Sequence, residues 1–222
     1  MCTVVVRLTT GTSEVLALRD ELTSRPFDDP GTWWPDQPDV VGGRDQVAGG
    51  SWCVTDRRTA TTALVLNRPL RRVALPGAPS RGVLPLLAVA HGEDWPSHVD
   101  VTGMATFTVV LVRPGTATVW DFDGDGLARR ELPEGTHMVT SGGVEDGKAD
   151  RFLGAFSARE PQHWQELLAP PADDRTALVV RHEGTDDAGH PVVFATVFGQ
   201  RVGAAGISCS RSPWEPATWR TV

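Results

Sequence analysis

Cys2 follows the initiator methionine directly and precedes the β-branched and apolar run TVVVRL at residues 3–8. Initiator methionine is removed when the next residue is small, so we expect a mature chain with a thiol and an α-amino group on one residue. The amine, with a usual pKa of about 7.7–8.0, can accept the proton of a thiol with a usual pKa of about 8.5. This predicts a cysteine nucleophile that carries its own base, as N-terminal threonine nucleophiles do. The alternative is a tolerated small residue near a frayed chain end.

A cation and a carboxylate follow at the end of the next apolar segment. The turn signal TTGTS separates residues 3–8 from EVLAL, so these segments are expected to pair as a hairpin. The returning strand then brings Arg19 and Asp20 back beside Cys2. A cation near the sulfur lowers the thiol pKa, and a carboxylate near the amine holds and orients it. Taken alone, such a pair is more often a surface ion pair or a turn cap.

The composition limits the classes of function. The chain has 222 residues and no obvious linker, so we expect one domain over residues 1–222. The net charge of −7 argues against nucleic acid as a partner, because that affinity rests on clustered Lys and Arg. Lys148 is the only lysine, which we attribute to a GC-rich genome. Three cysteines without a CxxC pair, no secretion signal and no long apolar run predict a cytoplasmic protein without a membrane span.

Turn residues and periodicity predict the elements of the first part of the chain. Residues 19–45 are rich in Pro, Asp and Gly without a period, so we expect a long functional loop. A second hairpin follows in QVAGGSWCVTD and TATTALVLN, where Gly49-Gly50 marks a bulge or a close backbone approach. SRGVLPLLAVAHG begins with a serine cap and predicts a helix over about 81–90, with Pro85 in its first turn.

Strands and helices alternate through the rest of the chain. A short helix is expected near 95–101, and four strands between about 105 and 141 are expected to form one meander. GKADRFLGAFSA and PQHWQELLA carry apolar residues at helical spacing. ALVVRHE is a possible strand, and HPVVFATVFGQ with RVGAAGISCS forms a last hairpin. This order predicts the α+β class, with two antiparallel sheets packed face to face and helices outside.

Other motifs do not indicate a metal or a second nucleophile. DFDGDG at 121–126 imitates an EF-hand loop, but its twelfth position is Leu132 and its flanks are strands, so a hairpin turn is expected. The six histidines are scattered without ligand spacing, and no metal or cofactor is predicted. Cys53 and Cys209 lie on apolar strands and are interpreted as small buried residues.

Several motifs occur in the order and at about the spacing of one protein family. They are MCT, LRDELTSRP, WWPDQPDVVGGRD, AGGSW, APSRG and a late FGQR. On these motifs the chain resembles the NRDE family, also called the transport and Golgi organization 2 family, most densely up to about residue 82. This family is similar to the N-terminal-nucleophile hydrolases that begin with cysteine. The resemblance implies a four-layer αββα sandwich of two antiparallel sheets.

The resemblance also implies roles for five residues. Cys2 would be the nucleophile, Arg19 would stabilise its thiolate, and Asp20 would bind the α-amino group. Asn67, the only asparagine in the sequence, would donate to an oxyanion. Arg201, in FGQR, matches a late arginine that lies near the nucleophile in related amidases.

The sequence departs from the family pattern at three places. Leu18 stands where the motif that names the family begins with asparagine. The segment LVLNRP matches Asn67 to the family only if one residue is dropped, and such a slip turns a strand side chain to the other face. Gly142 or Gly143 stands where a second asparagine is expected, so an oxyanion would use backbone N–H groups there.

Two functions are kept as hypotheses. The first is a cysteine amidohydrolase that forms an acyl-enzyme on Cys2 from a small-molecule amide. The second is a non-catalytic binding or carrier protein for an apolar ligand such as haem or an acyl-CoA, by analogy with functions linked to the resembled family. In either case Trp33 and Trp34 of the long loop are candidates to close an apolar pocket, although packing against the edge of the sandwich is an equal alternative.

Overall fold

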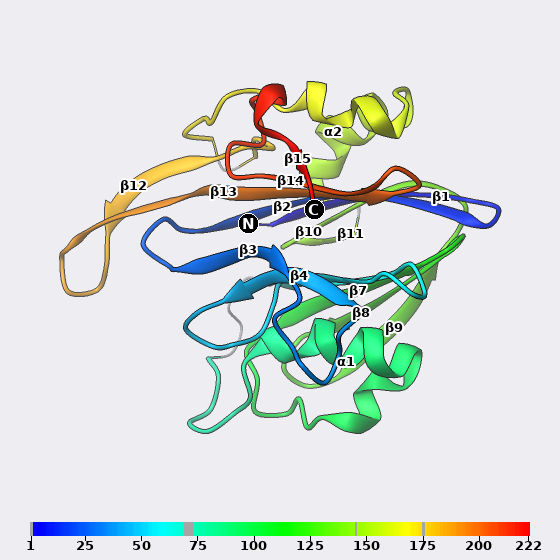
Figure 1. The fold of residues 1–222 in the computed structure, drawn as a ribbon. Helices are drawn as coiled ribbons and strands as arrows, with labels where there is room; N and C mark the ends of the chain where they lie inside the picture. Colours follow the sequence, from blue (N-terminus) through cyan, green and yellow to red (C-terminus); the bar gives the residue numbers. More distant parts are fainter. Residues whose placement is uncertain (1, 69–72, 145, 175) are drawn as a thin grey trace.

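Two antiparallel β-sheets form the centre of the protein, and helices cover their outer faces (Figure 1). The computed structural model describes residues 2–68, 73–144, 146–174 and 176–222. Sheet A contains, in spatial order, β11 (Gly143–Val144), β10 (Gly135–Thr140), β1 (Thr3–Thr9), β2 (Thr12–Leu22), β13 (Pro191–Gly203), β14 (Gly206–Ser210) and β15 (Arg220–Thr221), with β12 (Arg181–Thr185) paired to β13. Sheet B contains, in order, β3 (Phe27–Gly31), β4 (Val40–Asp45), β5 (Cys53–Asp56), β6 (Thr61–Asn67), β7 (Phe107–Arg113), β8 (Thr116–Phe122) and β9 (Leu127–Leu132). The predicted α+β class with two antiparallel sheets is confirmed.

Three apolar clusters hold these layers together by removing apolar surface from water. The central cluster lies between the sheets and includes Val4 of β1 and Val110 of β7. A second lies on the outer face of sheet B, under α1 (Leu84–His91) and η2 (Gly92–His98). A third lies on the outer face of sheet A, under α2 (Gly147–Ser157) and η3 (Pro161–Leu167). The likeness of this layering to N-terminal-nucleophile hydrolases stays a prediction.

The predicted N-terminal hairpin is confirmed. β1 and β2 pair antiparallel, with Thr3 opposite Leu18 and Thr9 opposite Thr12. β1 also pairs with β10 on its other side, so hydrogen bonds hold it along both edges. The first described residue, Cys2, therefore directly precedes an interior strand of sheet A.

The expectation of a long loop over residues 19–45 is wrong. β2 continues to Leu22, and β3 and β4 both lie within this stretch. β3 contains Pro30, but it is the edge strand of sheet B, where a missing N–H is tolerated. A Cβ at Gly43 of β4 would lie 2.3 Å from the Trp52 ring, so glycine permits close packing there. The Gly and Pro content reflects close contacts and an edge position rather than a loop.

The four strands expected as one meander divide between the two sheets. β7, β8 and β9 pair in sequence within sheet B, whereas β10 pairs with β1 of sheet A. The chain crosses between the sheets before Gly135, whose φ of +130° favours glycine. Met138 and Val139 of β10 are both buried, because this strand is covered on each face. Local alternation did not reveal the change of sheet.

The helix expected over 81–90 is confirmed as η1 (Arg81–Val83) followed by α1. Ser80 caps η1 by accepting a hydrogen bond from the Gly82 N–H, and Pro85 lies in the first turn of α1. The short helix expected near 95–101 is η2, which has 3-10 geometry and begins earlier, at Gly92. None of the helices that the structure describes is long and apolar enough to cross a membrane.

The last predicted elements are present with shifted boundaries. α2 is capped by Asp146, which accepts hydrogen bonds from the next turn's backbone amides. The second helical segment is the 3-10 helix η3. β12 begins at Arg181, directly after the apolar ALVV run, and β13 and β14 form the expected last hairpin. Cys53 and Cys209 are buried free thiols, as predicted.

Candidate functional site

A cavity of about 230 Å³ opens where the start of β1 and the end of β2 meet the end of β6 and two loops of sheet B. Its lining includes four of the predicted site residues, Cys2, Arg19, Asp20 and Asn67. The remaining lining residues are Glu21, Arg25, Asp45, Ser51, Trp52, Val65, Ser80, Arg81 and Gly82. Six of the lining residues are charged, so the cavity suits a small polar molecule.

The register of β1 and β2 explains why the predicted residues meet. Thr3 lies opposite Leu18, so the residues after Leu18 flank the residue before Thr3. Cys2 packs against the central cluster between the sheets, and Arg19 shares the face of β2 that points to that cluster. Asp20 lies on the opposite face of β2. The guanidinium and the carboxylate therefore approach the start of the chain from two faces of sheet A.

Charges of both signs surround the Cys2 thiol. Its S–H points to the backbone carbonyl of Asp20, with 3.8 Å between the sulfur and the oxygen. Burial raises the pKa of Cys2 above its usual value, the Asp20 carboxylate raises it further, and Arg19 opposes both effects. The expected effect of Arg19 is present, but burial outweighs it. The thiol is consequently protonated near neutral pH.

Aromatic rings and carboxylates hold the Arg19 side chain. Its guanidinium carbon lies 4.2 Å from the centre of the Trp52 ring and 5.0 Å from that of Phe27, distances typical of cation–π contacts. Its Nη2 lies 3.4 Å from Asp45 and 3.5 Å from Glu21. Burial lowers the pKa of Arg19, and the neighbouring carboxylates oppose this effect. Arginine remains charged in proteins, so Arg19 is a fixed cation beside the thiol.

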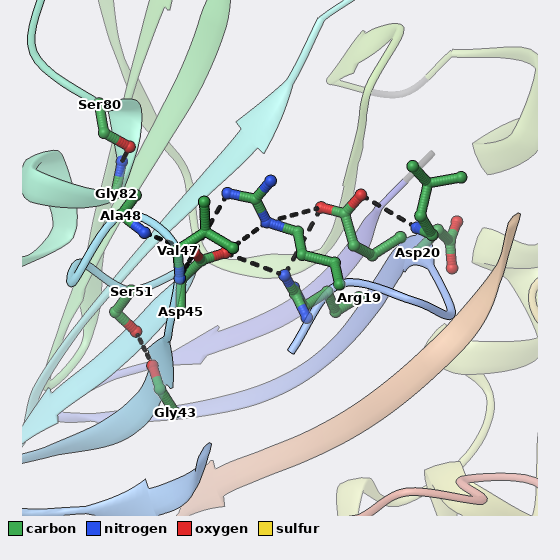
Figure 2. Close-up of polar contacts among 12 residues, drawn as sticks. Arg19, Asp20, Gly43, Asp45, Val47, Ala48, Ser51, Ser80 and Gly82 are labelled. Carbon is green, nitrogen blue, oxygen red and sulfur yellow. Dashed lines mark hydrogen bonds and ion pairs between the residues drawn. The ribbon is translucent and has the colours of Figure 1, made fainter. Parts of the chain in front are cut away.

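Asp45 links Arg19 to the rim of the cavity (Figure 2). It accepts two hydrogen bonds from Arg25, at 2.6 and 3.1 Å, and two more from the backbone amides of Val47 and Ala48. Burial alone would raise the pKa of Asp45, but these bonds outweigh it and lower the pKa below 3.8. The loop between β4 and β5 is thereby tied to the end of β2.

A bulge in β13 positions both neighbours of the Arg19-Asp20 pair. The register between β13 and β2 shifts between Thr196 and Phe198, so Thr196 lies opposite Asp20 and Phe198 opposite Arg19. Thr196 donates a hydrogen bond of 2.6 Å to Asp20 Oδ1 and accepts one from the Val180 amide. Burial raises the pKa of Asp20, and the Thr196 bond opposes this effect.

Lys148, at the start of α2, is a second buried cation near Asp20. Its side chain is 5% exposed, and its Nζ donates a hydrogen bond of 3.1 Å to Thr3 Oγ1. Burial lowers the pKa of Lys148, and Asp20 and Asp146 raise it. Lys148 was not among the predicted site residues. Its one signal is that it is the only lysine in the chain.

A close contact between two glycines forms the opposite wall. A Cβ at Gly50 would lie 2.4 Å from the Gly82 carbonyl, so the predicted close backbone approach is confirmed at this position. Ser51 N–H also donates to the Gly82 carbonyl at 2.8 Å. This contact fixes Arg81 at the cavity, where its Nη1 donates to the Thr106 carbonyl at 2.9 Å. Arg81 was not predicted, although the motif APSRG contains it.

A family model described as transport and Golgi organisation 2 matches residues 1–139. The chain belongs to this family. The match spans more than half of the sequence and contains every residue that lines the cavity. Lys148 and Thr196 lie beyond the matched part of the transport and Golgi organisation 2 family model. No curated protein matches the chain.

Three predicted site residues lie away from the cavity. Arg201 donates hydrogen bonds to the Gln162 carbonyl at 3.0 Å and the Gln165 side chain at 2.9 Å, on the outer face of sheet A. Trp33 donates from its indole to a carbonyl of β3 and lies beneath a guanidinium of β4. Trp34 donates to the Gly49 carbonyl and packs against the outer cluster of sheet B. The aromatic residue at the cavity is instead Trp52.

Gly142 and Gly143, one of which stands where a second family asparagine is expected, also lie outside the cavity lining. Gly142 donates its N–H to Thr140 Oγ1 at 3.0 Å, so this amide is not directed at the cavity. A Cβ at Gly142 would lie 2.2 Å from the Asp146 carboxylate, which explains the need for glycine. Among the described residues, no group of three or more His, Cys, Asp or Glu side chains gathers as metal ligands would.

Proposed function

We propose that this protein is an N-terminal-nucleophile cysteine hydrolase that cleaves the C–N bond of a small-molecule amide. One observation carries the proposal: Cys2, Arg19 and Asp20 line one small polar cavity at the start of an interior strand. The resemblance of the fold to N-terminal-nucleophile hydrolases belongs to the same proposal. Family membership alone assigns no chemistry, because function depends on the site and not on the fold.

Removal of Met1, which lies outside the described residues, would place the α-amino group on Cys2. Burial of the Cys2 thiol then becomes part of the mechanism, because burial disfavours the thiolate and a protonated thiol needs a base at the moment of attack. The amine would take the thiol proton, and the resulting ammonium would be held by the Asp20 carboxylate. Arg19, opposite in sign to a thiolate, would stabilise the sulfur as its charge develops.

The reaction would proceed through a thioester on Cys2. The thiolate attacks the amide carbonyl carbon, and the oxyanion that forms accepts a hydrogen bond from the Asn67 amide. When the C–N bond breaks, the leaving amine takes the proton held by the α-ammonium group. Water then attacks the thioester, and the α-amine of Cys2 accepts a proton from that water. The C–S bond breaks, the carboxylic acid product departs, and the α-ammonium group returns the proton to the Cys2 sulfur.

The alternative of an apolar carrier has less support from this cavity. Its volume of about 230 Å³ is below the roughly 300–1,000 Å³ of typical ligand pockets, and haem and acyl-CoA are large ligands. Charged side chains dominate its lining, and Trp33 and Trp34 lie elsewhere. The cavity geometry therefore favours a small polar substrate over an apolar ligand.

The test replaces the nucleophile while keeping the cavity. Cys2→Ala should lower the rate of hydrolysis of N-acyl anilides by a factor of at least about 10³. The released aniline is measured by absorbance. Cys2→Ser keeps a nucleophilic oxygen and the α-amine, so it should retain slow turnover. Cys209→Ala is the control, since this buried thiol lies outside the cavity, and it should keep wild-type turnover. Turnover by Cys2→Ala at the wild-type rate would contradict the proposal.

A further inference from the structure

The charged side chains of the cavity wall pair unevenly. Asp45 accepts two hydrogen bonds from Arg25 and lies 3.4 Å from Arg19. Glu21 lies 3.5 Å from Arg19 and 3.9 Å from Arg25. These two carboxylates and two guanidinium groups compensate one another. Asp20, the third carboxylate, lies on the other face of β2.

Arg81 has no carboxylate partner within the described ranges. Its guanidinium makes one hydrogen bond there, from Nη1 to the Thr106 carbonyl, and no ion pair within 4.0 Å. Burial lowers the pKa of Arg81, and the more distant Glu21 opposes this effect. Because arginine stays protonated, the wall carries a half-buried positive charge that no adjacent carboxylate neutralises.

Arg19 presents a buried donor without a hydrogen-bond partner among the described residues. Its side chain is 5% exposed, and its Nη1 has no hydrogen-bond partner among the described residues, whereas Nη2 is shared by two carboxylates. A buried donor left without a partner is costly. An acceptor atom bound at this edge would remove that cost, and Arg19 lines the same cavity as Arg81.

We propose that Arg81, together with Arg19 Nη1, which is unpaired among the described residues, binds the carboxylate of a monoanionic small molecule in this cavity. A planar carboxylate matches the two parallel N–H groups of a guanidinium. A single uncompensated cation suits a single negative charge. The identification of this molecule as an amide substrate that carries a carboxylate rests on the proposed function. The anion site itself rests only on the cavity and its charges.

Two nearly isosteric reagents test the site without any substrate. Iodoacetate and iodoacetamide both alkylate the Cys2 thiolate, so the thiolate fraction cancels in the ratio of their rate constants. Each rate constant is measured by mass spectrometry of the Cys2 peptide, and N-acetylcysteine amide gives the reference ratio of a neutral thiol. The protein carries a net charge of −7 and should repel iodoacetate elsewhere. At Cys2 we expect an iodoacetate preference about fivefold or more above the reference.

Variants assign the preference to Arg81. Arg81→Gln should lower the ratio of the iodoacetate to the iodoacetamide rate constant about fivefold or more. Arg81→Lys keeps the charge but loses the two parallel N–H groups of the guanidinium, so it should give an intermediate ratio. Arg58→Gln removes an exposed charge outside the cavity and should leave the ratio unchanged. The inference is overturned if folded Arg81→Gln keeps the wild-type ratio, or if the wild-type ratio does not exceed the reference.

The wild-type protein alone provides a second arm in case Arg81→Gln does not fold. Added salt should lower the ratio of the iodoacetate to the iodoacetamide rate constant, because only iodoacetate is attracted by the charge of the site, while any change in the thiolate fraction cancels in the ratio. Equal salt dependence of both rate constants would contradict the site. The two proposals also fail separately. If Arg81→Gln lowers the ratio of the iodoacetate to the iodoacetamide rate constant but no assay detects amide turnover, the anion site stands and the hydrolase proposal fails. If amide turnover is detected but Arg81→Gln leaves this ratio unchanged, the hydrolase proposal stands and the anion site fails.

Discussion

The Cys2 thiol is held in its protonated form by two effects of the fold. Burial disfavours the thiolate, and the Asp20 carboxylate adds a like charge close to it. Arg19 acts in the opposite direction without prevailing. The proposed mechanism uses Asp20 for a different purpose, to hold the α-ammonium group. Asp20 is therefore expected to slow simple alkylation of Cys2 and to be needed for turnover.

Asp20→Asn separates these two roles. Removing the negative charge should lower the pKa of Cys2 and raise its rate of alkylation by iodoacetamide at pH 8 by about two- to tenfold. The same variant should lose amide turnover by about 10² or more, because the amine loses its anionic partner. Asp94→Asn, which removes an exposed carboxylate, should change neither. A fall of both rates, or no change in either, would contradict the assignment.

The site residues that the sequence predicts correctly are those whose positions depend only on neighbouring segments of the chain. Cys2 and the Arg19-Asp20 pair were placed by one hairpin, which requires only a turn and two apolar runs. Arg81 and Lys148 were missed because their positions depend on contacts between distant segments. Lys148 reaches Thr3 across 145 residues, and composition alone does not indicate such a contact.

The elements that carry the site are held by features that sequence patterns describe poorly. β4 consists of valine and glycine followed by a charged pair, so it resembles a loop until Trp52 is seen to pack on it. β10 continues the alternation of the three strands before it and yet joins the other sheet. Strand existence follows from local periodicity, whereas strand partners follow from long-range burial. The hairpins and α1 were predicted because their signals are local.

Asp45 joins β4 of sheet B to β2 of sheet A, and its titration should be visible in stability. Its folded pKa is lowered, so its contribution is fully present above the unfolded value of about 3.8 and is lost as pH falls through the folded pKa. Asp45→Asn should reduce the free energy of unfolding by roughly 1.5–3 kcal/mol at pH 7. The difference from wild type should shrink below about pH 4.

Urea unfolding between pH 7 and pH 3 measures both parts of this prediction. Asp187→Asn, in the exposed turn between β12 and β13, is the matched control and should have little effect. A difference between Asp45→Asn and wild type that stays constant down to pH 3 would show that the charge of Asp45 does not stabilise the fold.

The two sheets place Cys2 at a polar opening beside the apolar cluster between them. The central cluster fills the space between the sheets, and the cavity lies at the end of that space beside Cys2. The protein is acidic overall, yet the described residues of this cavity include a cation without a carboxylate partner. A reactive thiol here would be reached only by molecules that fit about 230 Å³ and tolerate its charges.

Mass spectrometry of the protein after brief exposure to limiting iodoacetamide shows whether Cys2 is an N-terminal nucleophile. We expect a chain that begins at Cys2, with label on Cys2 and almost none on the buried Cys53 and Cys209. The pKa of Cys53 is raised to about 12 by burial, which makes it an internal reference for an unreactive thiol. A chain that retains Met1 and carries equal label on all three cysteines would rule out Cys2 as an N-terminal nucleophile.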